Sequence, residues 1–249
     1  MSLLNEIISL ADQSTDMWER ARLTKFTSSE NYRLMTDGKR EMTASELKVM
    51  KLANPKSKAK TIEDINILSE GARTYVLEKV AETITGESAF FENFATKWGT
   101  EHEPIARKEF EKLTGLDVEQ VGFVPFNEYS GGSPDGVFYN ADGKKDGILE
   151  IKCPYNSANH IEHLLIQDQN YFKENFKEYY WQMQSNMLFT GTHKAWFISF
   201  DPRAKDHAFF MMLFQSNISD QQLIEKKLKV ANDYKNEILN KINSKKQAE

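Results

Sequence analysis

The chain has 249 residues, of which 40% are hydrophobic and 28% are charged, a composition typical of a soluble globular protein and not of a fibrous or disordered one. Its single cysteine excludes an internal disulfide and a cysteine-based zinc or iron–sulfur centre, so any metal is expected on oxygen or histidine ligands. A formal net charge of −5 argues against a uniformly basic protein that coats nucleic acid.

Charge is distributed unevenly along the first part of the chain. Residues 39–60 carry seven basic residues against two acidic ones, whereas residues 61–98 carry seven acidic residues against three basic ones. The basic stretch is compatible with a contact to nucleic acid, although charge alone more often indicates a solvated loop.

The apolar periodicity predicts the secondary structure that follows. A long helix is expected at 61–86 and a second at about 100–115, each with a 3.6-residue period and a glycine at its end. Helices are also expected at roughly 173–190 and in the Lys-rich segment after Ser219. Segments rich in Val, Ile, Phe and Tyr between turn signals predict strands at 117–126, 134–140, 147–153, 194–201 and 207–215. This order favours an α+β fold in which helices cover a sheet.

The most informative segment is a predicted hairpin around Asp142-Gly143, a strong signal for a two-residue turn. A turn centred there places Asp135 opposite Glu150, with Cβ atoms about 5 Å apart. Lys152 lies two residues beyond Glu150 and therefore on the same sheet face. Two carboxylates on a largely buried strand are costly unless a cation compensates them, and hard oxygen ligands suit Mg²⁺ or Mn²⁺. From the spacing alone, a partly exposed Asp-Lys-Glu ladder remains an alternative.

Two motifs surround these carboxylates, Ser133-Pro134-Asp135-Gly136 and Leu149-Glu150-Ile151-Lys152-Cys153-Pro154. Together they resemble the core of the PD-(D/E)xK nucleases, specifically the lambda-exonuclease or YqaJ-like phage recombinase family. The resemblance extends from Trp18 to about Arg203 and implies a restriction-endonuclease-like α+β core, with a central mixed β-sheet flanked by helices. It also implies a metal-dependent exonuclease that degrades one strand of linear double-stranded DNA from 5′ to 3′ and leaves 3′ single-stranded overhangs for recombination by strand annealing.

The same resemblance implies how the carboxylate hairpin would work. Asp135, Glu150 and the backbone carbonyl of Ile151 would bind the principal Mg²⁺ ion, for which Mn²⁺ could substitute, and two ions are expected per site. Lys152 would help to organise the attacking water.

Two helical residues are assigned by resemblance, and each has a structural alternative. Glu103 takes the position of the family's helical active-site acid and would help to hold a second ion, but Thr100-x-x-Glu103 also spells a helix capping box. Gln182, in the Tyr-x-x-Gln-x-Gln motif, would orient the water together with Lys152. Its alternative is an amphipathic helix whose glutamines face solvent.

A pocket for the terminal 5′-phosphate is implied by Arg22, Ser29 and Ser133, because a guanidinium and two hydroxyls can bind phosphate oxygens together. A buried tryptophan with a solvated Arg22, and ordinary turn chemistry at Ser133, are the alternatives. The sequence departs from the lambda-type pattern at Ala158, where a basic residue is expected. His160 could substitute for it, or it could be a solvated loop residue.

The expected organisation is a single nuclease domain over residues 1–249, with a basic insert at about 37–60 and a helical extension at about 217–249 that lack clear family counterparts. The resemblance further implies double-stranded DNA ends as substrate, a homotrimeric ring and a single-strand annealing partner. The start of the chain is unlike a signal peptide and no apolar run is long enough to span a membrane, so we expect a cytoplasmic protein. The resemblance implies a phage or prophage protein in a bacterial host. A structure-specific or restriction-like endonuclease of the same core, or a non-catalytic DNA-binding module, remains open.

Overall fold

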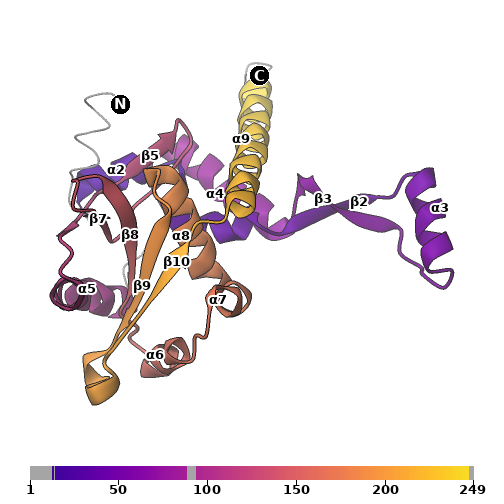
Figure 1. Ribbon diagram of the computed structural model, residues 1–249. Helices are drawn as coiled ribbons and strands as arrows, with labels where there is room; N and C mark the ends of the chain where they lie inside the picture. Colours follow the sequence, from indigo (N-terminus) through magenta and orange to yellow (C-terminus); the bar gives the residue numbers. More distant parts are fainter. Residues whose placement is uncertain (1–12, 14, 89–93, 247–249) are drawn as a thin grey trace.

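A five-stranded mixed sheet forms the centre of the computed structural model, which describes residues 13, 15–88 and 94–246 (Figure 1). The strand order is β10-β9-β8-β7-β4, with β8 and β9 parallel and the other neighbours antiparallel. The strands of this sheet are β4 (Val118–Glu119), β7 (Gly136–Tyr139), β8 (Lys145–Lys152), β9 (Lys194–Phe200) and β10 (Phe209–Gln215). The expected α+β fold with a mixed sheet and flanking helices is confirmed.

Helices cover both faces of the sheet. On one face, α5 (Phe94–Thr114) shares a core cluster with Leu149 of β8. On the other, α8 (Lys177–Thr190) shares a larger core cluster with Ile148. Because alternate side chains of a strand point to opposite faces, Glu150 is directed towards the α8 layer.

Most of the remaining elements surround this core. Further helices are α4 (Glu70–Thr85), α6 (Ser157–Leu164), α7 (Gln169–Asn175), the 3₁₀ helix η2 (Pro202–His207) and the C-terminal α9 (Ile218–Lys246). The N-terminal part contains α2 (Asp16–Arg22), β1 (Phe26–Thr27) and the 3₁₀ helix η1 (Ser28–Leu34), and β1 forms a small sheet with β6 (Ser130–Gly132) and β5 (Val124–Asn127). Across the described ranges, no helix is both long and apolar enough to cross a membrane.

The expected helix at 61–86 is wrong in its first third. Residues Thr61–Leu68 form strand β3, and α4 begins only at Glu70, where the Ser69 side chain accepts the Ala72 N–H as an N-cap. The β-branched residues of this segment suit a strand, and pairing with β2 (Asp37–Glu41) overrides the helical period.

Three further boundaries differ from the expectation. The second helix begins at Phe94 and not near Thr100, so Thr100 lies inside α5, where its hydroxyl donates to the Thr96 carbonyl. The helix expected at 173–190 is divided at Phe176, whose φ of −124° separates α7 from α8. The strand expected at 117–126 is two short strands in different sheets, β4 and β5.

The basic stretch forms an arm that projects from the body of the molecule (Figure 1). It consists of β2, the helix α3 (Ala44–Ala53) and β3, and none of its residues from 39 to 67 is buried. Arg40 ties the arm together, because its guanidinium forms ion pairs with Glu46 at 2.8 Å and Asp64 at 2.7 Å. The solvated-loop interpretation is therefore wrong: the segment is an ordered two-stranded ribbon with a helix at its tip.

An ion pair between a buried lysine and a partly exposed aspartate anchors the base of this arm. Lys227 of α9 has no solvent exposure and contacts the Asp37 carboxylate at the first residue of β2. Asp37→Ala is expected to lower the free energy of unfolding by about 3 kcal/mol, since it leaves a buried ammonium without a counter-charge. Urea denaturation measures this, and the double variant Asp37→Ala/Lys227→Met should recover most of the loss. A single variant as stable as the wild type would show that the pair contributes nothing.

Candidate active site

The hairpin between β7 and β8 brings the two predicted carboxylates together, although its turn differs from the expected one. The loop has three residues, closed by Asn140 and Lys144, with Gly143 at φ 72°. A bulge at Asp146 then offsets the extra loop residue, because Tyr139 pairs with Lys145 whereas Phe138 pairs with Gly147. The predicted two-residue turn is wrong, yet the register at the far end of the hairpin is the predicted one.

Asp135 immediately precedes β7 and faces Glu150 across this pair. Its backbone N–H donates to the Leu149 carbonyl at 3.1 Å, and its Oδ2 accepts the Ile151 N–H at 2.6 Å. The carboxylate is thus held against the backbone of the strand that carries Glu150. Both side chains are buried, with exposed fractions of 9% for Asp135 and 0% for Glu150.

Lys152 completes the arrangement on the α8 side of the sheet. Its Nζ lies 2.7 Å from Glu150 Oε1 and donates to Gln182 Oε1 at 3.3 Å. The ammonium also lies 4.9 Å from the centre of the Tyr179 ring, a cation–π contact. Gln182 is buried, so the alternative that the glutamines of this helix face solvent is wrong.

Glu103 approaches the site from α5, and Arg107 links it to the backbone of Asp135. Glu103 Oε1 accepts from Arg107 Nη2 at 2.6 Å, and Arg107 Nε donates to the Asp135 carbonyl at 3.2 Å. The capping-box alternative for Glu103 is wrong, because the residue lies in the third turn of α5. Sequence reasoning assigned no role to Arg107, although its spacing of four from Glu103 on a helix is a usable signal.

The electrostatics of the cluster favour a bound cation. Burial, reinforced by the charge of Asp135, raises the pKa of Glu103 to about 8. Burial raises the pKa of Glu150 to about 7 and also raises that of Asp135, although Lys152 opposes both shifts. Burial alone would lower the pKa of Lys152, but Glu150 and Asp135 raise it, so the ammonium stays charged.

These residues fit a divalent metal ion. Among the described residues, buried Glu150 Oε1 has no hydrogen-bond partner beyond its ion pair with the Lys152 ammonium at 2.7 Å, and the available donors are hard oxygens. Among the described residues, no three His, Cys, Asp or Glu side chains converge as a ready-made metal cluster. Mg²⁺ does not require one, because it usually keeps several waters and binds through one or two carboxylates.

The raised carboxyl pKa values predict how pH and metal act on stability. A group whose pKa is raised on folding stabilises the fold below its unfolded value, and this contribution is lost as pH rises through about 7 for Glu150 and about 8 for Glu103. In EDTA, the melting temperature should therefore fall between pH 5.5 and pH 8.5. Added Mg²⁺ should raise it more at pH 8.5, because protons and metal compete for the same oxygens. Differential scanning fluorimetry measures both effects, and a Mg²⁺ effect independent of pH would contradict this electrostatic account.

The residues proposed for the 5′-phosphate are only partly brought together. The Arg22 guanidinium stacks on the Trp18 ring at 4.1 Å, and Trp18 Nε1 donates to Ser133 Oγ at 2.9 Å. Trp18 thus joins Arg22 to a hydroxyl two residues from Asp135, which contradicts the interpretation of Ser133 as turn chemistry alone. Ser29 lies in η1, and its hydroxyl is 3.4 Å from that of Thr27.

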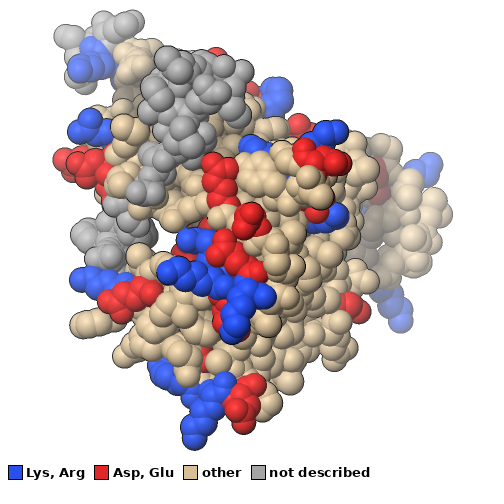
Figure 2. Space-filling model, turned by 60° about the vertical axis from the view of Figure 1, so that its left-hand side comes forward, with Lys and Arg blue, Asp and Glu red and all other residues tan. Residues whose placement is uncertain are grey.

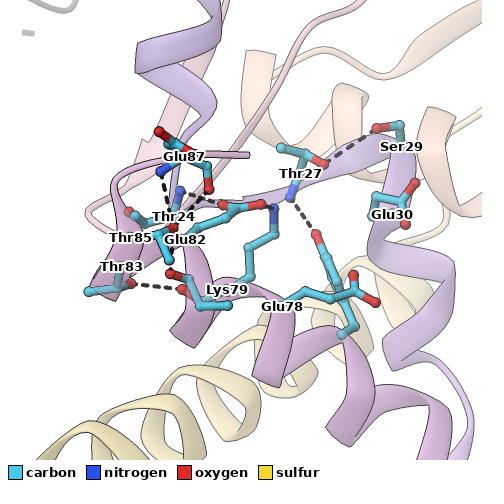
Figure 3. A network of polar contacts seen from close by, with 12 residues as sticks. Thr24, Thr27, Ser29, Glu30, Glu78, Lys79, Glu82, Thr83, Thr85 and Glu87 are labelled. Atoms are coloured by element: carbon cyan, nitrogen blue, oxygen red, sulfur yellow. Dashed lines mark hydrogen bonds and ion pairs between the residues drawn. The ribbon is translucent and has the colours of Figure 1, made fainter. Parts of the chain in front are cut away.

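A polar network holds the loop between Arg22 and Ser29 (Figure 3). Thr24 has a φ of 66°, which is uncommon for a residue with a side chain, and its N–H donates to Glu82 Oε2 at 2.8 Å. Lys79 binds the other Glu82 oxygen at 2.7 Å, and the Thr27 N–H donates to the Tyr75 hydroxyl at 3.1 Å. The helix α4 therefore fixes the loop that joins two of the candidate phosphate ligands, Arg22 and Ser29.

His160 fills neither of the roles expected for it. It is completely buried, with Nδ1 at 2.7 Å from Ser199 Oγ and Nε2 at 2.7 Å from the His207 carbonyl. Arg203, in η2, pairs with Asp201 and lies over the Trp98 ring at 4.3 Å. Figure 2 shows the side of the molecule on which α2 and α5 lie in Figure 1, and acidic and basic side chains gather in a band across it.

The central mixed sheet, the Asp135–Glu150 hairpin and a lysine two residues after the glutamate define the PD-(D/E)xK class of fold. The model of the YqaJ-like viral recombinase domain family matches residues 17–193, and the chain belongs to this family. No curated protein matches the chain significantly. Family, fold and site together support a nuclease.

Solved structures agree with this assignment. The alkaline exonuclease LHK-Exo from Laribacter hongkongensis is 26% identical, with a TM-score of 0.71 over 94% of this chain and 99% of its own. A second structure of LHK-Exo, in complex with dAMP, matches to the same extent. A phage-related exonuclease from Haemophilus somnus 129PT is 17% identical with a TM-score of 0.63, and covers 96% of this chain and 99% of its own, which supports the fold alone.

Proposed function

We propose that this chain is a metal-dependent exonuclease that degrades one strand of linear double-stranded DNA from 5′ to 3′ and leaves 3′ overhangs. The observation that carries the proposal is the convergence of Asp135, Glu150 and Lys152, joined through Trp18 and Ser133 to the Arg22 guanidinium. The family, and the exonuclease named among its structural neighbours, support the same activity.

The chemistry is divided between metal ligands and residues that place the nucleophile. Asp135, Glu150 and the Ile151 carbonyl would hold the principal ion and Glu103 a second one, and Mg²⁺ (or Mn²⁺) supplies charge that polarises the scissile phosphate. Lys152 and Gln182 would hold the attacking water between them, and the 3.3 Å contact of Lys152 Nζ with Gln182 Oε1 supports this role. Arg107 fixes Glu103 through its 2.6 Å contact.

End recognition is assigned to Arg22, Ser29 and Ser133. Arginine can bind two phosphate oxygens together, and the two hydroxyls add uncharged donors. Ala158 contributes no charge, so dependence on a 5′-phosphate should rest on Arg22. Digestion of duplexes with and without a 5′-phosphate, by the wild type and Arg22→Gln, tests this assignment.

The arm is proposed to contact duplex DNA through its exposed positive charge. Replacing four of its lysines by glutamine should weaken DNA binding and make it less dependent on salt. The slope of the logarithm of the binding constant against the logarithm of the salt concentration should change by about 0.9 for each phosphate that the arm no longer neutralises. The replaced residues are Lys48, Lys51, Lys56 and Lys58. The matched control replaces four lysines of α9: Lys226, Lys229, Lys241 and Lys245. Fluorescence anisotropy at several salt concentrations measures the slope, and an arm variant with the wild-type slope would exclude this role.

The assembly and partners are proposals that rest on family membership. They comprise a homotrimeric ring around DNA, a single-strand annealing protein that takes over the 3′ overhang, and a setting in the cytoplasm of a bacterium that carries a phage or prophage. Light scattering of the purified protein tests the trimer directly.

Linear and covalently closed circular duplexes separate the proposed activity from its rivals. An exonuclease should degrade the linear duplex with Mg²⁺ and leave the closed circle intact. Rapid cutting of the closed circle would favour the restriction-like or structure-specific endonuclease. DNA binding without hydrolysis of either substrate would favour a non-catalytic module.

A further inference from the structure

Helix α8 presents two amides to the two functional residues of β8. Gln182 contacts Lys152 at 3.3 Å, and Asn186 Nδ2 donates to Glu150 Oε2 at 3.2 Å. Four residues of a helix advance about 6 Å and two residues of a strand about 6.6 Å, so the spacings match. The proposed mechanism gives Gln182 a role, whereas it gives Asn186 none.

Asn186 and Lys152 hold the two oxygens of the Glu150 carboxylate. Asn186 donates to Oε2, and the Lys152 ammonium lies 2.7 Å from Oε1. Glu150 and Asn186 both have no solvent exposure. A buried carboxylate held at both oxygens has a fixed orientation, which is what a metal ligand requires.

The contacts of Asn186 differ from ordinary core packing and suit a side chain that orients its neighbour, Glu150. Its Oδ1 is buried without a hydrogen-bond partner in the described part of the chain, a cost in free energy that an apolar residue would avoid. The amide lies so close to β6 that a Cβ on Gly132 would be 2.3 Å from Asn186 Oδ1 and 2.6 Å from Ser28 Oγ. Glycine at position 132 therefore makes room for this amide beside the strand that leads to Ser133.

We propose that Asn186 is a positioning residue that orients the Glu150 carboxylate for metal binding. This inference rests on the proposed metal-dependent nuclease function. It assigns Asn186 no contact with DNA and no role as a metal ligand.

The test compares two variants of buried amides on the same helix. Asn186→Leu removes the donor to Glu150. Gln184→Leu is the matched control, because Gln184 is also buried but its side chain bonds the Gln215 carbonyl and the Asn217 N–H, away from Glu150. Mn²⁺ binding without DNA, followed by the electron paramagnetic resonance signal of the free ion, gives the affinity, and thermal unfolding gives the stability of each variant.

Asn186→Leu should bind Mn²⁺ about 10- to 100-fold more weakly than the wild type. Gln184→Leu should lose stability and keep the wild-type Mn²⁺ affinity. If Asn186→Leu does not fold, Asn186→Ala removes the same donor without added bulk, and the same loss of affinity is expected. A folded Asn186 variant with wild-type Mn²⁺ affinity would overturn the inference while leaving the proposed function intact. A wild-type protein that binds no Mn²⁺ would instead overturn the proposed function and this inference with it.

Discussion

Lys152→Ala should lower the rate of cleavage of linear duplex DNA by at least about 100-fold, the range expected when a group that positions a nucleophile or a proton is removed. The ammonium lies 2.7 Å from Glu150 and 3.3 Å from Gln182, and in the proposed mechanism it helps to hold the attacking water. Release of acid-soluble nucleotides with Mg²⁺ at saturating DNA measures the rate.

Lys194→Ala is the matched control for this variant. Lys194 lies on the neighbouring strand β9 and forms an ion pair at 2.8 Å with Asp146, which belongs to the β7–β8 hairpin but lies away from the candidate site. The Lys194→Ala variant should cleave DNA at close to the wild-type rate. A folded Lys152→Ala protein that keeps more than about a tenth of the activity would remove Lys152 from the mechanism.

Asp135→Asn should reduce cleavage by about 1,000-fold or more, because loss of a metal-binding carboxylate removes several kcal/mol of transition-state stabilisation. The substitution is nearly isosteric, and an amide oxygen can still accept the Ile151 N–H now bound by Asp135 Oδ2. The fold should therefore survive, and any loss of activity reports on the chemistry.

Asp135→Asn should lower activity but raise the stability of the metal-free protein. Burial raises the pKa of Asp135, and its charge adds to the cost of ionising Glu103 and Glu150. In EDTA at pH 8, Asp135→Asn should melt at a higher temperature than the wild type, while the stabilisation by Mg²⁺ should be largely lost. Asp146→Asn, in the same hairpin, should show neither effect. Unchanged Mg²⁺ stabilisation in Asp135→Asn would exclude Asp135 as a ligand.

The site was predictable where local pairing determines it. The hairpin carries Asp135, Glu150 and Lys152 within 18 residues, and strand alternation alone places them on one face. The details of the turn were not predictable, because a three-residue loop and the bulge at Asp146 change the register twice and cancel.

Contacts between distant segments were the part that the sequence could not supply. Arg107 of α5 reaches the Asp135 backbone carbonyl and Asn186 of α8 reaches the Glu150 carboxylate, and only the packing of these helices on opposite faces of the sheet brings them there. The error at 61–68 has a related cause, because pairing with β2 makes a strand of a segment whose apolar period is helical. Ser133 is proposed for the phosphate pocket by resemblance alone, and its link to Arg22 through Trp18 needed the structure.

The net charge of −5 acquires a structural explanation in the same way. Part of the acidity comes from Glu103, Asp135 and Glu150, whose charges bound divalent cations would offset, while the excess of positive charge at 39–60 lies on the projecting arm. Overall charge therefore says little about nucleic-acid binding in this protein, and its distribution says more.

The central claim is that, at a duplex end, this site removes nucleotides from the strand that ends there with its 5′ terminus. The most direct measurement is a time course on a linear duplex labelled at both ends of one strand, in Mg²⁺, by the wild type and Asp135→Asn. We predict early release of the 5′ label, late loss of the 3′ label and a growing 3′ single-stranded overhang, all abolished in the variant. Early release of the 3′ label, or equal digestion by Asp135→Asn, would contradict the account.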